Sequence, residues 1–122
     1  MKRMRALADS RLYVLTDSRM IDTRDIFAIV DAVAAAGADI IQYREKHKSR
    51  ELMLAETRRL AEIVHNREKL FIINDYADLV AESGADGVHL GQDDMSVAAA
   101  RKIIPDGTLI GFSTHSVAQA VA

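Results

Sequence analysis

Five short apolar runs, each separated from the next by a segment with helical periodicity, restrict this 122-residue chain to few folds. The runs are rich in Val, Ile and Leu and most are nearly continuous, as strands are when both faces of a parallel sheet are covered. They span residues 12–16, 39–44, 69–74, 87–91 and 108–113. This alternation of strands and helices predicts an α/β protein with one parallel sheet.

Helix boundaries between the runs carry recognisable signals. Ser49 and Ser96 stand where an N-cap is expected, and a short helix over residues 77–83 ends before Gly84. Gly37 ends an earlier helix, and both glycines open a Gly-Ala-Asp sequence that leads into a strand. We interpret this echo as one turn chemistry used twice, because glycine suits the left-handed position after a helix.

The composition excludes several classes of protein. Sixteen Lys and Arg against eighteen Asp and Glu give a net charge of -2, which offers no general surface for nucleic acid or membrane. Without cysteine there is no disulfide framework or thiolate metal site, and no apolar run approaches the ~20 residues of a membrane span. The basic residues at the start of the chain do not fit the pattern of a signal peptide. We therefore expect a single domain over residues 1–122 and a cytoplasmic location.

The second strand turns polar at its carboxyl end. Gln42, Arg44 and Lys46 occupy alternate positions, so they share one face if the strand continues through Lys46. An amide, a guanidinium and an ammonium at one strand tip would suit a polar, anionic ligand. A solvated strand end is the structural alternative.

Acidic residues follow the next two strands. Asn74-Asp75 and Asp93-Asp94 stand where the carboxyl ends of neighbouring strands would bring them close to the cations. Such a mixture suggests a phosphorylated substrate with a metal ion. Two alternatives stay open: Asp75 as the N-cap of the next helix, and Asp93-Asp94 as an acidic pair favoured by a helix dipole.

Two architectures compete at this point. Length favours a doubly wound sheet, because a (β/α)₈ barrel usually needs roughly 250 residues. With Ser113 at the end of the fifth run, the candidate residues follow four different strands, which is typical of a barrel's carboxyl-terminal rim, whereas an open sheet gathers its ligand at one switch point. There is no Gly-x-Gly-x-x-Gly or Walker loop to indicate a nucleotide fold.

Taken in order, the motifs resemble the thiamin phosphate synthase family over residues 12 to about 120. The resemblance rests on residues 12–17, 42–46, 74–75, 84–94 and 111–115. It implies an incomplete TIM barrel with about five of the eight strands. It also implies a Mg²⁺-dependent transferase that joins 4-amino-2-methyl-5-hydroxymethylpyrimidine pyrophosphate to thiazole phosphate, releasing pyrophosphate and forming thiamin phosphate.

Matching positions then receive roles implied by the resemblance. The pyrimidine pyrophosphate would be held by Gln42, Arg44, Lys46, Asn74 and Ser113, and magnesium by Asp75 and Asp94. The family pattern selects Asp94 over Asp93, and a helix cap for residues 115 onward is the alternative for Ser113. No catalytic residue is assigned beyond these binding groups; His89, His115 and Asp17 stay unassigned.

Rival functions stay open. A thiazole tautomerase on the same scaffold also has a histidine two residues after the fifth-strand serine, as His115 is here. The second rival is a non-catalytic half-barrel that acts as a binding module. The family's thiazole-phosphate loop has no counterpart here, so we expect the isolated chain to be inactive or poorly active. Open edges at the first and fifth strands invite a homo-oligomer or a completing chain.

Overall fold

The architecture is a parallel five-stranded sheet covered by helices. A computed structural model describes residues 2–17, 19 and 25–121. The strands are β1 (Tyr13–Asp17), β2 (Ile40–Arg44), β3 (Leu70–Asn74), β4 (Gly87–Leu90) and β5 (Leu109–Phe112). All neighbours are parallel, and the order in the sheet is β1-β2-β3-β4-β5. A doubly wound sheet reverses its strand order at a switch point, so this sequential order excludes that alternative.

Helices follow the strands along the chain. They are α1 (Lys2–Asp9), α3 (Ile26–Ala35), α4 (Arg50–Asn66), α5 (Asp78–Ser83), α6 (Val97–Ile103) and α7 (Val117–Val121). Ser49 caps α4 by accepting from Leu52 N, and Ser96 caps α6 by accepting from Ala99 N, as the sequence predicts. The predicted short helix at 77–83 begins one residue later, and Gly84 ends it in the left-handed conformation.

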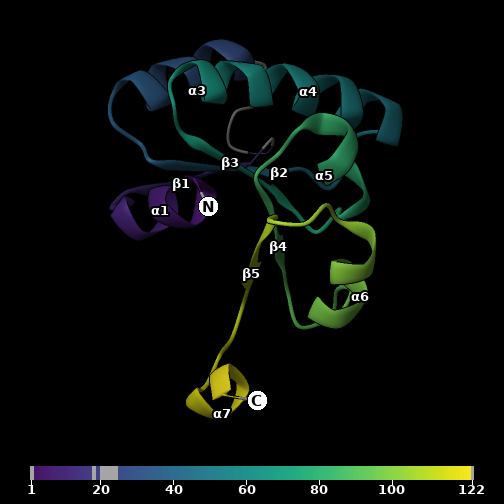
Figure 1. The fold of residues 1–122 in the computed structure, drawn as a ribbon. Helices are drawn as coiled ribbons and strands as arrows, with labels where there is room; N and C mark the ends of the chain where they lie inside the picture. The colour runs from purple at the N-terminus through teal and green to yellow at the C-terminus, as the bar shows by residue number, and fades with distance from the viewer. Residues whose placement is uncertain (1, 18, 20–24, 122) are drawn as a thin grey trace.

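Two apolar layers hold the sheet. On one face, Ile41, Tyr43, Phe71 and Val88 pack among the side chains of the covering helices, with Leu60 of α4 fully buried. Figure 1 shows α3, α4, α5 and α6 on this side. On the other face, a smaller cluster joins Ile40, Leu70, Ile72 and Leu109 with Ala6 of α1. The second face is therefore apolar near the amino ends of the strands.

The helices at the two ends of the chain differ in their packing. The sequence did not predict α1, which packs against the second face and sends Arg3 to the buried carboxylate of Asp86 at 2.8 Å. In contrast, α7 buries none of its residues and stands apart at the end of β5 (Figure 1). Within the described ranges, no helix combines the length and apolar character needed to cross a membrane.

The two Gly-Ala-Asp sequences fold alike. Gly37 and Gly84 have φ of +118° and +81°, and the aspartate of each sequence binds the start of the preceding strand. Asp39 accepts from the backbone N–H of Leu12 at 3.0 Å, and Asp86 accepts from that of Phe71 at 2.8 Å. The predicted shared turn chemistry is confirmed, and the aspartate side chain is a part of it.

Candidate functional site

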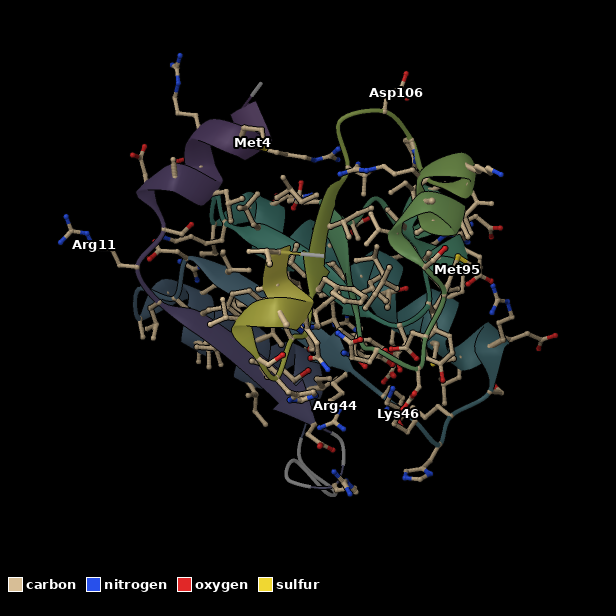
Figure 2. All side chains as sticks on the ribbon, turned by 90° about the horizontal axis from the view of Figure 1, so that it is seen from below. Met4, Arg11, Arg44, Lys46, Met95 and Asp106 are labelled. Atoms are coloured by element: carbon tan, nitrogen blue, oxygen red, sulfur yellow. The ribbon has the colours of Figure 1, made fainter. Side chains whose placement is uncertain are left out.

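A cavity of about 660 Å³ opens at the carboxyl ends of the strands. Every site residue predicted from the sequence lines it: Gln42, Arg44, Lys46, Asn74, Asp75, Asp94 and Ser113. The other lining residues are Tyr13, Leu15, His89, Gly91, Gln92, Asp93 and His115. In Figure 2, Arg44 and Lys46 lie at this end, while Met4 and Asp106 lie at the opposite end.

A chain of amides forms the buried wall of the cavity. Gln42 is 2% exposed; its Nε2 donates to Tyr13 Oη at 2.9 Å, and its Oε1 accepts from Asn74 Nδ2 at 3.0 Å. The oxygen of the Asn74 amide, Oδ1, is buried and has no hydrogen-bond partner among the described residues. Burial raises the pKa of the Tyr13 hydroxyl, although the bond from Gln42 opposes the shift. This wall therefore offers a ligand one buried acceptor and a neutral hydroxyl.

The cations lie beside carboxylates at the cavity mouth. β2 ends at Arg44, as predicted, so the condition that the strand continues through Lys46 is not met, yet Lys46 still lines the cavity. Its ammonium pairs with Asp75, and Arg44 Nη1 lies 3.6 Å from Asp17 Oδ2. Hydrogen bonds from Arg19 are the main reason why the pKa of Asp17 lies below its ordinary value. Both cations are partly exposed and stand within reach of an incoming anion.

Asp75 adopts an unusual backbone conformation. Its φ is +69°, in the left-handed region that is unfavourable for residues other than glycine. The N-cap of α5 is Ala77, with no side-chain cap bond, so the alternative role of Asp75 as an N-cap is wrong. Its backbone N–H donates to His89 O at 2.8 Å, which extends the contact between β3 and β4 to the cavity floor. Strain of this kind often accompanies functional positions.

Asp94 closes the loop after β4. Its Oδ2 accepts from Gly91 N at 2.6 Å, and a Cβ at Gly91 would lie only 2.9 Å from the same oxygen. The helix α6 begins beyond Ser96, which supplies its side-chain cap. Asp93 lines the cavity as well, so the structure does not separate the two acids by location. Both are exposed.

His89 and Ser113 meet across β4 and β5. His89 Nε2 lies 2.7 Å from Ser113 Oγ, and Gln92 Nε2 donates to Ser113 O at 2.8 Å. Desolvation by burial lowers the pKa of His89, although the charge of Asp94 opposes the shift. The imidazole is therefore neutral near pH 7. The cap alternative for Ser113 is wrong, because Ser116 is the serine that accepts from the helix, at Gln119 N.

The donor set suits one kind of metal ion. Among the described residues there is no cluster of three or more His, Cys, Asp and Glu side chains that could hold a metal. Asp75, Asp93 and Asp94 line the cavity, but the described residues do not gather all three carboxylates around one point, so a cation would meet one or two of them. Mg²⁺ is commonly bound in this way, with waters and substrate phosphates completing its coordination. Asp75 and Asp94 therefore fit magnesium that arrives with a phosphorylated ligand, and not a preformed all-protein site.

Several cavity residues were not predicted from the sequence. Tyr13 and His89 each bond to a predicted residue, and Gln92 and His115 complete the rim. The alternation of β1 was a usable signal for Tyr13, because it places Tyr13 on the same face as Leu15. No sequence signal distinguishes His89 from a packed histidine in a strand.

The comparisons with known proteins cover the residues that line the cavity. The family model described as "Thiamine monophosphate synthase" matches residues 12–122. The chain belongs to the thiamine monophosphate synthase family. A thiamine-phosphate synthase of Synechococcus sp. (strain WH7803) is 41% identical over 119 residues, which are 97% of this chain and 34% of that protein. One of Lawsonia intracellularis (strain PHE/MN1-00) is 41% identical over 92% of this chain and 52% of its own length.

A solved structure shares the fold. The thiamine phosphate pyrophosphorylase from Pyrococcus furiosus superposes with a TM-score of 0.82 at 30% identity, over 91% of this chain and 53% of that one. The chain thus spans between a third and just over half the length of these members of the thiamine monophosphate synthase family.

Proposed function

We propose that the chain is the amino-terminal, five-stranded part of a (β/α)₈ barrel that works as a thiamin phosphate synthase. Two observations support the barrel. The strands run in sequential parallel order, and the chain superposes on 53% of the Pyrococcus furiosus protein. In such a barrel the active site lies at the carboxyl ends of the strands, which is where the cavity opens. The proposed reaction joins a pyrimidine pyrophosphate to a thiazole phosphate and releases pyrophosphate.

Arg44 and Lys46 are the proposed pyrophosphate ligands. A guanidinium and an ammonium form charge-assisted hydrogen bonds with phosphate oxygens, and both groups reach the cavity from the end of β2. Because each already faces a carboxylate, the cations are held in place before the ligand arrives. They would neutralise the charge that develops on the pyrophosphate as its bond to the pyrimidine methyl carbon breaks.

The amide wall is the proposed contact for the pyrimidine ring. An aminopyrimidine presents N–H donors and ring-nitrogen acceptors. Within the part of the chain that the structure describes, Asn74 Oδ1 is a buried acceptor without a partner, and Tyr13 Oη carries a proton that it can donate. Gln42 holds both groups in place through its two hydrogen bonds. Ser113, fixed by His89, would contact the phosphate end.

Magnesium is the proposed cofactor, with Asp75 and Asp94 as its carboxylate ligands. When bound, it would supply further positive charge to the leaving pyrophosphate. No residue in the cavity needs to act as a strong base, because the thiazole nitrogen attacks with its own lone pair.

The observation that carries the proposal is the convergence of all the predicted residues on one cavity. Titration calorimetry with the pyrimidine pyrophosphate, with and without Mg²⁺, tests it. We expect Mg²⁺-dependent binding that weakens about tenfold or more in Arg44→Ala and Asp75→Ala, because each removes a charged contact. Arg50→Ala and Asp78→Ala are matched controls, because these two residues pair with each other and do not line the cavity. Binding that is equal in all five proteins, or absent from the folded parent, would contradict the proposal.

Specific observations favour two alternative functions. His115 lines the cavity, and a histidine two residues after the fifth-strand serine is a feature that the chain shares with a thiazole tautomerase. The limited share of the relatives' length that the chain spans suits a half-barrel that binds without turnover, completed by a second copy or another chain. The synthase is preferred because both cations and both proposed metal ligands are present. A tautomerase would act on a thiazole phosphate without requiring the pyrimidine pyrophosphate.

A further inference from the structure

The residue between the two cavity cations points away from the cavity. Glu45 follows Arg44 and precedes Lys46, and its side chain is only 1% exposed. Alternation along the chain places it on the same side as Tyr43, beneath the covering helices. A buried carboxylate is unfavourable unless hydrogen bonds or opposite charge compensate it. The partners of Glu45 therefore indicate what it does.

The partners of Glu45 that can be named among the described residues belong to the turn that carries Lys46. Glu45 Oε1 accepts from the backbone N–H of Lys46 at 2.9 Å and from that of His47 at 2.8 Å. Its other oxygen lies 3.8 Å from the ammonium of Lys48. One buried side chain thus binds the backbone of the next two residues and faces the cation that follows them.

Lys48 connects this turn to the long helix α4. Its ammonium donates to both carboxylate oxygens of Glu56, at 2.8 and 2.9 Å. Glu56 Oε1 also accepts from Tyr43 Oη at 2.8 Å. The turn after β2 is therefore attached to the sheet and to the helix by side chains that do not line the cavity.

We propose that Glu45 is a positioning residue for the pyrophosphate site, acting through Lys46. Its carboxylate fixes the backbone from which Lys46 extends, and Asp75 holds the ammonium at the other end. A side chain restrained at both ends loses less rotamer freedom when an anion binds. This inference rests on the proposed function of the cavity as a pyrophosphate site.

The substitution Glu45→Gln separates positioning from bulk. Glutamine keeps the size and one carbonyl acceptor but loses the charge that strengthens the two backbone bonds and attracts Lys48. We expect the affinity for inorganic pyrophosphate with Mg²⁺ to fall about fivefold to tenfold, from the ordering of one long side chain. Hydrogen exchange at the amides of Lys46 and His47 should become about tenfold faster.

A double-mutant cycle with Lys46→Met distinguishes positioning from a merely structural role. If Glu45 acts through Lys46, Glu45→Gln has no further effect on pyrophosphate affinity in the Lys46→Met background. Tyr43→Phe is the control: it breaks the bond to Glu56 in the same buried cluster but keeps both bonds from Glu45 to the backbone of the turn, and it should bind as the parent does. An equal loss in both backgrounds, or unchanged affinity and amide exchange in Glu45→Gln, would overturn the proposal.

The same titrations separate this inference from the function it rests on. Absence of magnesium pyrophosphate binding in the folded parent would refute the proposed function, and with it the role of Glu45. Binding by the parent, Tyr43→Phe and Glu45→Gln alike would refute the role of Glu45 alone. Where Glu45→Gln does not fold, Glu45→Met takes its place. Methionine keeps the length of the side chain and suits a buried position, but it offers the two amides no oxygen acceptor, so the same loss is expected.

Discussion

We predict that replacing Gly111 by alanine lowers the stability of the protein, because the imidazole ring of His89 lies over Gly111. The two residues are paired in the register of β4 and β5, and a Cβ at position 111 would lie 2.5 Å from His89 Nδ1. The next nearest atoms, at 3.3 and 3.4 Å, also belong to the imidazole ring. In Gly111→Ala the ring must therefore move, and its 2.7 Å contact with Ser113 is lost.

The expected loss of stability combines three contributions. Overpacking of a filled site costs about 1–3 kcal/mol. Loss of the bond between His89 and Ser113 costs about 0.5–1.5 kcal/mol. Replacing glycine by alanine returns about 0.4–1 kcal/mol by restricting the unfolded chain. The free energy of unfolding should therefore fall by about 2 kcal/mol.

Urea unfolding followed by far-ultraviolet circular dichroism measures this loss. In a His89→Ala background the obstructing ring is gone, so Gly111→Ala should be neutral or slightly stabilising. Gly87→Ala is the contrasting control, because its Cβ would lie 2.5 Å from the backbone oxygen of Leu109, which no side-chain deletion relieves. A similar cost for Gly111→Ala in both backgrounds would refute the steric argument.

Three further predictions concern Asp75, His65 and the activity of the whole chain. Asp75→Gly should raise the free energy of unfolding by about 0.5–1 kcal/mol by relieving the left-handed φ, while abolishing Mg²⁺-dependent ligand binding; a less stable variant in urea unfolding would contradict this. The hydrogen bond to Asp86 raises the pKa of His65 above 6.5, so its stabilising contribution is complete below that pH and is lost as pH rises through the folded-state pKa. The stability advantage of the parent over His65→Gln should therefore shrink from pH 6 to 9, and pH-independent differences would refute it. Finally, in an assay for thiamin phosphate, the purified chain should turn over far more slowly than the Pyrococcus furiosus relative, and equal rates would exclude the half-barrel reasoning.

The strands could be predicted from the sequence because burial on both faces leaves a continuous apolar run, whereas their order in the sheet followed only from the family resemblance. Each observed strand lies within one residue of its predicted ends. The shared cavity was also predictable, because parallel strands place their carboxyl ends at one edge. The helix α1 was not, since its eight residues carry only Met4 and Leu7 as large apolar side chains, and both stay exposed.

Contacts between strands account for what the sequence could not predict. The role of Tyr13 depends on a diagonal reach to Gln42, and that of His89 on the space above Gly111. Both require the register, which single-residue patterns do not encode. Aspartate is one of the few residue types other than glycine that adopt a left-handed backbone, but the residue type alone does not single out Asp75 among the aspartates. Magnesium, the cytoplasmic location and the individual ligand roles stay predictions.

The Gly-Ala-Asp turns have a consequence for how the chain folds as it is made. Asp39 secures the amino end of β1, and Asp86 secures that of β3, so in each pair the anchoring carboxylate is translated after the strand that it binds. During synthesis the backbone N–H groups of Arg11 and Leu12 stay open to water until residue 39 has left the ribosome. Folding of this sheet is thus expected to lag one strand behind translation. Each of these two strands becomes fixed only when the aspartate before the next strand has been made.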